Sequence, residues 1–160
     1  MPDPAELVLS LKNEERTRVL GRLLGERATP GLVILLFGEL GAGKTTLAQG
    51  LTEGLGCATR ASSPTFNLLH LHSGRLPLVH ADLYRLDDAD SVEDLGLAEL
   101  VEAGAVAAVE WPELAGDALP EERVEVTLLE SGEGREAHLR AVGREAGELL
   151  AGLADAYSVA

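Results

Sequence analysis

The sequence contains very little cysteine and very little lysine. Cys57 is the single cysteine in 160 residues, so the chain cannot form an internal disulfide, and no cysteines and histidines have the spacing of a structural zinc site. We therefore expect a protein of the reducing cytoplasm. Lys12 and Lys44 are the only lysines, and the formal net charge is −14. Because so acidic a chain repels phosphate backbones, we expect no direct DNA binding and contact with RNA only through partner proteins.

Long apolar segments are also missing. The longest clearly apolar run, LVILLF at residues 32–37, is far shorter than the ~20 residues that span a bilayer. The first residues lack a basic segment followed by an apolar one, so we expect neither export nor a membrane anchor. Apolar residues nevertheless make up 46% of the chain and charged residues 25%, as in ordinary folded domains. We expect one domain over residues 1–160.

The spacing of apolar residues predicts an α/β fold. Continuous apolar runs at 32–37 and 105–110 are typical of strands buried on both faces of a parallel sheet. Other runs, separated in pairs by turn-prone residues, predict antiparallel hairpins, and helical spacing indicates helices with Asn13 and Ser91 as N-caps. The expected helices span 14–27, 45–56, 91–104 and 144–157, a first strand spans 7–11, and the hairpins pair 65–72 with 76–83 and 122–130 with 135–143. Together they predict a mixed parallel and antiparallel sheet with helices on both faces.

Residues 38–46, GELGAGKTT, carry the pattern G-x-x-x-x-G-K-[ST] of a phosphate-binding loop. The glycines let backbone N–H groups turn inward around an anion, Lys44 reaches the outer phosphates, and the Thr45 hydroxyl ligates Mg²⁺. The motif follows a predicted strand and opens a predicted helix, so the fold class narrows to a three-layer fold like that of P-loop NTPases. The expected nucleotide-binding residues are Gly38, Glu39, Leu40, Gly41, Ala42, Gly43, Lys44, Thr45 and Thr46.

Two acidic residues are candidates for the metal and the attacking water. Glu110 ends the run at 105–110, which is typical of a central parallel strand, so we assign it to the metal together with Thr45. Asp82 ends a strand that contains a proline and belongs to a hairpin. We expect Asp82 either to orient or deprotonate the attacking water or to be a second anchor of the magnesium shell. Lys44, Asp82 and Glu110 form the candidate catalytic set.

Several nearby residues have two interpretations. Trp111, the only tryptophan, follows Glu110 and is either a core or interface aromatic or part of the nucleotide pocket. The segment 62–66, SSPTF, is either a nucleotide-sensing switch or a rigid turn. His70, His72 and His80 lack a further ligand at suitable spacing, so we expect structural or solvent-facing roles for them.

Four motifs, in this order and spacing, closely resemble the TsaE family, also called YjeE, the small P-loop ATPases of the bacterial machinery that makes threonylcarbamoyladenosine in tRNA. The motifs are GELGAGKTT at 38–46, SPTF at 63–66, HADLYRL at 80–86 and VEWPE at 109–113. The resemblance extends from about residue 10 to near the end of the chain. It implies slow ATP hydrolysis with Mg²⁺ and action with the partners TsaB and TsaD, of which TsaD performs the carbamoyl transfer.

The resemblance also implies roles for individual residues. Lys44 and Thr45 of the loop, Asp82 of the HADLYRL motif and Glu110 of the VEWPE motif match family positions that serve nucleotide and magnesium. The start of the first helix lies near the adenine in the family, which points to Glu14.

A small-molecule kinase is the main alternative, because kinases of this size use the same loop. Such kinases close a basic lid over the phosphates to exclude water. Seven arginines and no lysine follow Lys44, and no segment gathers them as a lid requires. A GTP switch would need an N-K-x-D motif, which the sequence lacks. The sequence therefore favours the ATPase.

Overall fold

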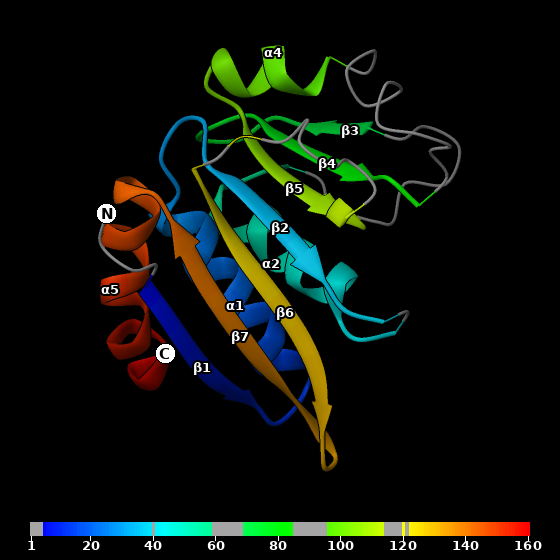
Figure 1. Ribbon diagram of the computed structural model, residues 1–160, viewed down its shortest axis with the longest axis vertical. Helices are drawn as coiled ribbons and strands as arrows, with labels where there is room; N and C mark the ends of the chain where they lie inside the picture. Colours follow the sequence, from blue (N-terminus) through cyan, green and yellow to red (C-terminus); the bar gives the residue numbers. More distant parts are fainter. Residues whose placement is uncertain (1–4, 40, 59–68, 85–95, 114–119, 121) are drawn as a thin grey trace.

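A seven-stranded mixed sheet forms the centre of the computed structural model (Figure 1). The structure describes residues 5–39, 41–58, 69–84, 96–113, 120 and 122–160. The strands are β1 (Ala5–Leu11), β2 (Val33–Phe37), β3 (Leu69–His72), β4 (Leu78–Asp82), β5 (Val106–Glu110), β6 (Arg123–Ser131) and β7 (Gly134–Val142). Their order across the sheet is β1-β7-β6-β2-β5-β4-β3.

The pairing confirms the mixed sheet expected from the sequence. β2 runs parallel to both β5 and β6, and β4 runs parallel to β5. The hairpins β3–β4 and β6–β7 are antiparallel, as is the pair of β1 and β7. β2, β4, β5 and β6 consequently point the same way, and the arrowheads of β2, β4 and β5 lie at one edge of the sheet (Figure 1). In open α/β sheets, this carboxyl edge is where ligands bind.

Helices cover both faces of the sheet. The helices are α1 (Glu14–Arg27), α2 (Lys44–Gly54), α4 (Leu97–Glu102) and α5 (Arg144–Val159). Side chains of α1, α2 and α5 share one apolar cluster with alternate strand residues such as Ile34 and Leu36. α4 packs in a second cluster with the intervening residues, such as Val33 and Leu35. This alternation produces the three layers. None of the helices in the described ranges is long and apolar enough to cross a membrane.

α1 and α2 touch backbone to backbone. Gly21 and Gly25 of α1 face Gly50 and Gly54 of α2, and each pair would bring an added Cβ atom within 3.0 Å of the opposite Cα. A Cβ atom on Gly50 would lie 2.2 Å from the carbonyl oxygen of Arg18, so only hydrogen fits there. The contact fixes α1 against the helix that begins at the glycine loop.

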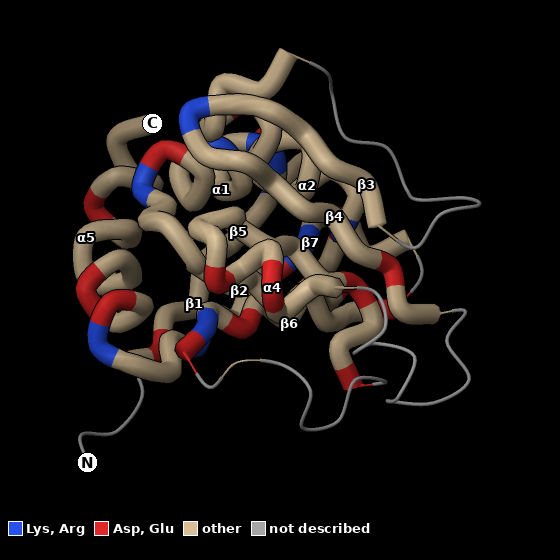
Figure 2. The backbone as a smooth tube through the Cα atoms, turned by 90° about the horizontal axis from the view of Figure 1, so that it is seen from above, with Lys and Arg blue, Asp and Glu red and all other residues tan. Residues whose placement is uncertain are grey.

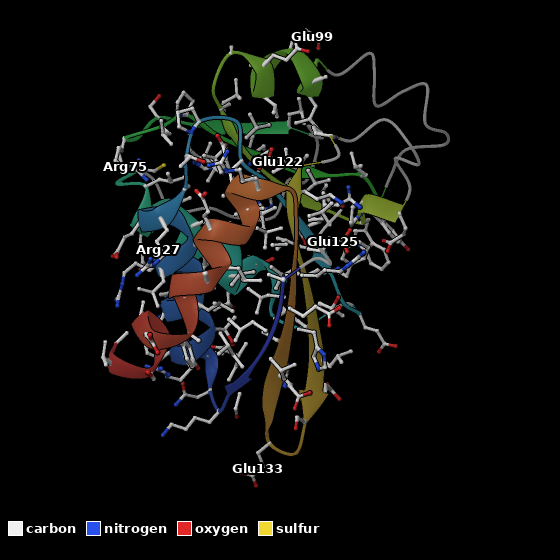
Figure 3. The ribbon with its side chains drawn as sticks, turned by 60° about the vertical axis from the view of Figure 1, so that its left-hand side comes forward. Arg27, Arg75, Glu99, Glu122, Glu125 and Glu133 are labelled. Atoms are coloured by element: carbon white, nitrogen blue, oxygen red, sulfur yellow. The ribbon has the colours of Figure 1, made fainter. Side chains whose placement is uncertain are left out.

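Two helix ends are closed by side chains distant in sequence. The Arg75 guanidinium donates to the carbonyl oxygen of Gly25, 2.8 Å away, near the end of α1 (Figure 3). Glu122 Oε1 accepts from the backbone N–H of Glu145 at 2.7 Å, in the first turn of α5. Glu122 satisfies a backbone N–H that a helix leaves without an internal partner, and Arg75 adds a charged donor to a carbonyl oxygen that also accepts from the N–H of the cap residue Ala28. They attach α1 and α5 to the sheet.

The predicted start of α1 is confirmed, and the predicted extent of α4 is wrong. Asn13 Oδ1 accepts from the backbone N–H of Arg16 at 2.9 Å, as an N-cap does. A continuous helix over 91–104 is contradicted by Gly96, whose φ of 79° lies in the left-handed region. α4 therefore begins at Leu97, and the expected cap Ser91 lies outside the described residues.

The α1–α2 contact predicts a stability effect at Gly50. Gly50→Ala should lower the free energy of unfolding by about 1–3 kcal/mol, because the added methyl group meets a backbone oxygen that cannot move away. Gly147→Ala is the matched control, since a Cβ atom there would meet nothing within 4 Å. That change should be neutral or stabilise α5 by up to about 1 kcal/mol. Equal urea midpoints for the two variants would contradict the prediction.

Candidate functional site

The loop between β2 and α2 owes its shape to glycines with positive φ. Gly38, Gly41 and Gly43 have φ values of 146°, 84° and 109°, which side-chain-bearing residues rarely adopt. At Gly38 an added Cβ atom would also lie 3.0 Å from the carbonyl oxygen of Leu128. Glycine is thus required there both for the bend and for the close approach of β6.

Lys44 folds back over this loop. It is the first residue of α2 and only 5% exposed, and its Nζ donates to the Gly38 carbonyl oxygen at 2.8 Å. The same ammonium lies 4.1 Å from the centroid of the Trp111 ring. Such a cation–π contact contributes about 0.5–2 kcal/mol. In the structure, therefore, the loop and the ring both hold the Lys44 ammonium.

Trp111 stands at the loop as well as against the core. Its ring contacts the second apolar cluster and lies 5.0 Å from the ring of Tyr84, centroid to centroid. Its φ of 57° is unusual for a bulky residue and costs about 1–2 kcal/mol. The surrounding contacts must outweigh that cost. The packing interpretation of Trp111 is confirmed, and the ring also lies beside Lys44. Its part in a nucleotide pocket stays a prediction.

Asp82 and Glu110 end two neighbouring parallel strands. They are register partners across β4 and β5, and Glu110 is also aligned with Leu36 of β2, two residues before the loop. Alternate residues of these strands, including Leu36 and Ala108, belong to the cluster beneath α1 and α2. Strand alternation therefore puts both carboxylates on the face that α2 covers. The expected acids thus share one edge and one face with the glycine loop.

The two carboxylates have different surroundings. Glu110 is 5% exposed, and its Oε2 lies 2.6 Å from His80 Nε2. Asp82 is half-buried, and its Oδ1 accepts from the backbone N–H of Tyr84 at 3.0 Å. The sequence grouped His80 with structural or solvent-facing histidines and missed this contact. The alternation His80-x-Asp82 was the available signal, because it puts the imidazole on the same strand face as the carboxylate.

The described part of the chain shows no metal centre built on the histidines. Within the described ranges, no group of three or more His, Cys, Asp or Glu residues is arranged to hold a metal ion. Burial, followed by the nearby His80 and His70, lowers the pKa of His72, so its ring is neutral at pH 7. The oxygen donors at the loop instead suit Mg²⁺, which keeps several waters and shares its shell with phosphate oxygens.

A cavity of about 160 Å³ opens on the other side of the loop. It lies between the loop, the start of α1 and the β6–β7 turn. Its walls are formed by Leu11, Asn13, Glu14, Thr17, Gly41, Ala42, Gly43, Thr46, Glu133, Gly134 and Arg135. Glu14, expected near a base from the family resemblance alone, is among them. Glu133 and Arg135 were not anticipated, because nothing in the sequence indicates that the β6–β7 turn reaches the loop.

Arg135 ties the β6–β7 hairpin to the loop. Its Nε donates to the Ala42 carbonyl oxygen at 3.2 Å, and its Nη2 donates to that of Gly41 at 3.3 Å.

Three other residues expected to bind the nucleotide lie in or beside the loop. Glu39 is exposed, while Thr45 and Thr46 are half-buried in the first turn of α2. Leu40 and the segment 62–66 lie outside the described residues.

Comparison with known proteins agrees with this geometry. The model of the family described as "Threonylcarbamoyl adenosine biosynthesis protein TsaE" matches residues 11–138. The chain belongs to the TsaE family. The chain is 42% identical over 133 residues to the tRNA threonylcarbamoyladenosine biosynthesis protein TsaE of Bacillus subtilis, covering 82% of this chain and 83% of that protein. It is 44% identical over 110 residues to the TsaE protein of Treponema pallidum, covering 69% and 78%.

A solved structure extends the match to the whole fold. The crystal structure of YdiB from Bacillus subtilis superposes with a TM-score of 0.82 and 33% identity, over 98% of this chain and 99% of that one. The P-loop fold and the TsaE resemblance expected from the sequence are confirmed. TsaE family proteins take part in threonylcarbamoyladenosine biosynthesis, so membership does not favour the small-molecule kinase.

The contact between Lys44 and Trp111 predicts a spectroscopic effect. Because Trp111 is the only tryptophan, all tryptophan emission reports on it. Lys44→Met removes a cation 4.1 Å from the ring centroid, so the emission of the free protein should change in maximum or intensity. Lys12→Met, at the only other lysine, is exposed and should leave the spectrum unchanged. Superimposable spectra for Lys44→Met and the unmodified protein would refute the contact.

Proposed function

We propose that this chain, acting as one domain over residues 1–160, binds MgATP and hydrolyses it slowly within the complex that forms threonylcarbamoyladenosine in tRNA. The main support for this proposal is that the glycine loop, Lys44, Asp82 and Glu110 lie at one edge and on one face of the sheet. Membership of the TsaE family supports the biological setting. We further propose TsaB and TsaD as the protein partners.

Each residue at the carboxyl edge has a separate role in the proposed hydrolysis. The loop N–H groups and Lys44 hold the phosphates, while Thr45 and Glu110 serve the metal side. Bound Mg²⁺ would neutralise charge on the phosphoryl oxygens. Asp82 orients a water for attack on the terminal phosphorus and accepts its proton. As the new phosphorus–oxygen bond forms, the bond to the bridging oxygen breaks, and ADP and phosphate result.

Lys44 must change partners for this to occur. In the structure, its ammonium is held by the Gly38 carbonyl oxygen and the Trp111 ring. A phosphate arriving at the loop offers a charged acceptor, which forms a stronger hydrogen bond than a neutral carbonyl. Lys44 then leaves the ring for the outer phosphates, and Trp111 remains as the wall of the site on that side.

The cavity beside the loop is proposed to receive the base. It adjoins the loop at Gly41 and Gly43 and is walled by Asn13, Glu14 and Thr17 at the start of α1. Ligand pockets commonly combine a concave shape with a few polar groups that fix orientation. Glu14 is the residue we propose to lie nearest the adenine.

The charge distribution supports indirect contact with tRNA. The described arginines and lysines are scattered over the molecule among acidic positions, rather than gathered into a basic face (Figure 2). Several arginines are already paired, such as Arg140 with Glu125 and Arg144 with Glu148. With a net charge of −14, this surface suits a subunit that leaves the RNA to its partners.

Binding and turnover should respond differently to substitutions. Lys44→Ala should abolish ATP binding in calorimetry, since the cation at the outer phosphates is lost. Asp82→Asn and Glu110→Gln should retain binding but lower hydrolysis at least 100-fold, because each removes a carboxylate from the water or the metal side.

Lys12→Ala is the matched control and should leave both measurements unchanged. Full ATP affinity in Lys44→Ala would remove that residue from the phosphate site. Full turnover in Asp82→Asn or Glu110→Gln would remove the substituted residue from the catalytic set.

The partners distinguish an ATPase subunit from a kinase. ATP hydrolysis should rise when TsaB and TsaD are added together, and no phosphorylated metabolite should appear when candidate small-molecule acceptors replace them. The measurement is phosphate release in parallel with mass spectrometry of the acceptors. Stoichiometric phosphorylation of an acceptor, without stimulation by the two proteins, would overturn the proposed function.

A further inference from the structure

One imidazole is buried directly behind the candidate metal-side acid. His80 has no exposed surface, Glu110 is 5% exposed, and their nearest atoms, Nε2 and Oε2, are 2.6 Å apart. The other ring nitrogen, Nδ1, is buried without a hydrogen-bond partner among the described residues. All of the polar contact that His80 makes within this part of the chain is therefore directed at Glu110.

The proposed metal-side role of Glu110 fixes the direction of the short contact. With Glu110 ionised as that role requires, the Nε2–H group donates and the carboxylate accepts. A carboxylate as buried as Glu110 is costly unless it is hydrogen-bonded. His80 thus provides the bond that makes a buried acid tolerable at this position.

The contact also decides which carboxylate oxygen is left for chemistry. Because Oε2 is bonded to His80 of β4, Oε1 is the carboxylate oxygen that remains to serve the metal side. His80 lies two residues before Asp82, so the two side chains share a strand face. β4 therefore supplies one acid directly and holds the other by its imidazole.

We propose that His80 is a positioning residue that fixes the Glu110 carboxylate with Oε1 presented to the metal side of the loop. The inference rests on the proposed function, in which Glu110 serves the metal. His80 is fully buried and acts through Glu110. Groups that orient metal-side ligands typically change activity or metal affinity 10- to 100-fold when they are removed.

Two amide substitutions separate positioning from packing. In His80→Gln, the amide nitrogen can occupy roughly the place of Nε2 and still donate to Glu110. In His80→Asn, the amide lies near the place of Nδ1, which has no partner. Both amides are uncharged and polar, but asparagine is also the smaller side chain, so packing alone would favour glutamine in stability. Metal affinity and a double variant with Glu110→Gln therefore complete the separation.

The expected results combine activity with metal binding. His80→Asn should lower kcat for ATP about 10- to 100-fold with the affinity for ATP unchanged, and His80→Gln should stay within a few-fold of the unmodified protein. Calorimetry of Mn²⁺ in the presence of ADP should show the same order, with weaker metal binding for His80→Asn only. In a Glu110→Gln background, His80→Asn should cause no further loss of kcat.

Several outcomes would overturn the inference. They are an unchanged kcat and Mn²⁺ affinity in His80→Asn, an equal loss in both amide variants, or independent losses in the double variant. If His80→Asn does not fold, the test rests on His80→Gln. A tenfold loss of kcat in a stably folded His80→Gln would overturn the inference, and retained activity in that variant would support it. Failure of the unmodified protein to bind or hydrolyse ATP would instead reject the proposed function.

Discussion

The backbone contact between α1 and α2 is the constraint on which the site depends. α2 begins at the glycine loop, and α1 begins at Glu14 on the wall of the neighbouring cavity. Because the facing glycines leave no room for side chains, the two helices pack as one unit. The place where phosphates are proposed to bind and the place proposed for the base are thus held at a fixed separation by backbone alone.

The rest of the site is assembled around that unit from separate strands. β4 and β5 bring Asp82 and Glu110 to the carboxyl edge, and the β6–β7 hairpin reaches the loop through Arg135. Both cations at the loop, Lys44 and Arg135, bond to carbonyl oxygens of the loop itself. These bonds hold the loop in a defined shape, which would reduce the ordering cost of binding a phosphate.

The features that could be predicted from the sequence are those that depend on short local patterns of residues. The strand–loop–helix motif around Lys44, the buried runs that became β2 and β5, and the cap Asn13 each depend on residues close together in the chain. The contact of His80 with Glu110 was missed because it depends on β4 lying beside β5 in one particular register. Strand order is decided by packing of the whole sheet, which no single segment reveals.

The same reasoning explains the other gaps. The sequence does not indicate the role of Arg135, since its partners are backbone oxygens that lie far away in the chain. Nor does it indicate the contact between the glycines of α1 and α2, because helix propensity alone counts against glycine at these positions. The predicted α4 was too long, because the apolar spacing continues across Gly96 and does not reveal that this residue has a left-handed backbone conformation.

The Trp111 ring also bears on how tightly the proposed nucleotide would be held. An ammonium group occupies one position at a time, so the ring and the Gly38 carbonyl compete with any incoming phosphate for Lys44. Giving up contacts worth about 1.4 kcal/mol weakens a dissociation constant roughly tenfold. In the proposed function, these contacts act as an internal competitor that lowers affinity for substrate and product alike and eases the departure of a spent nucleotide.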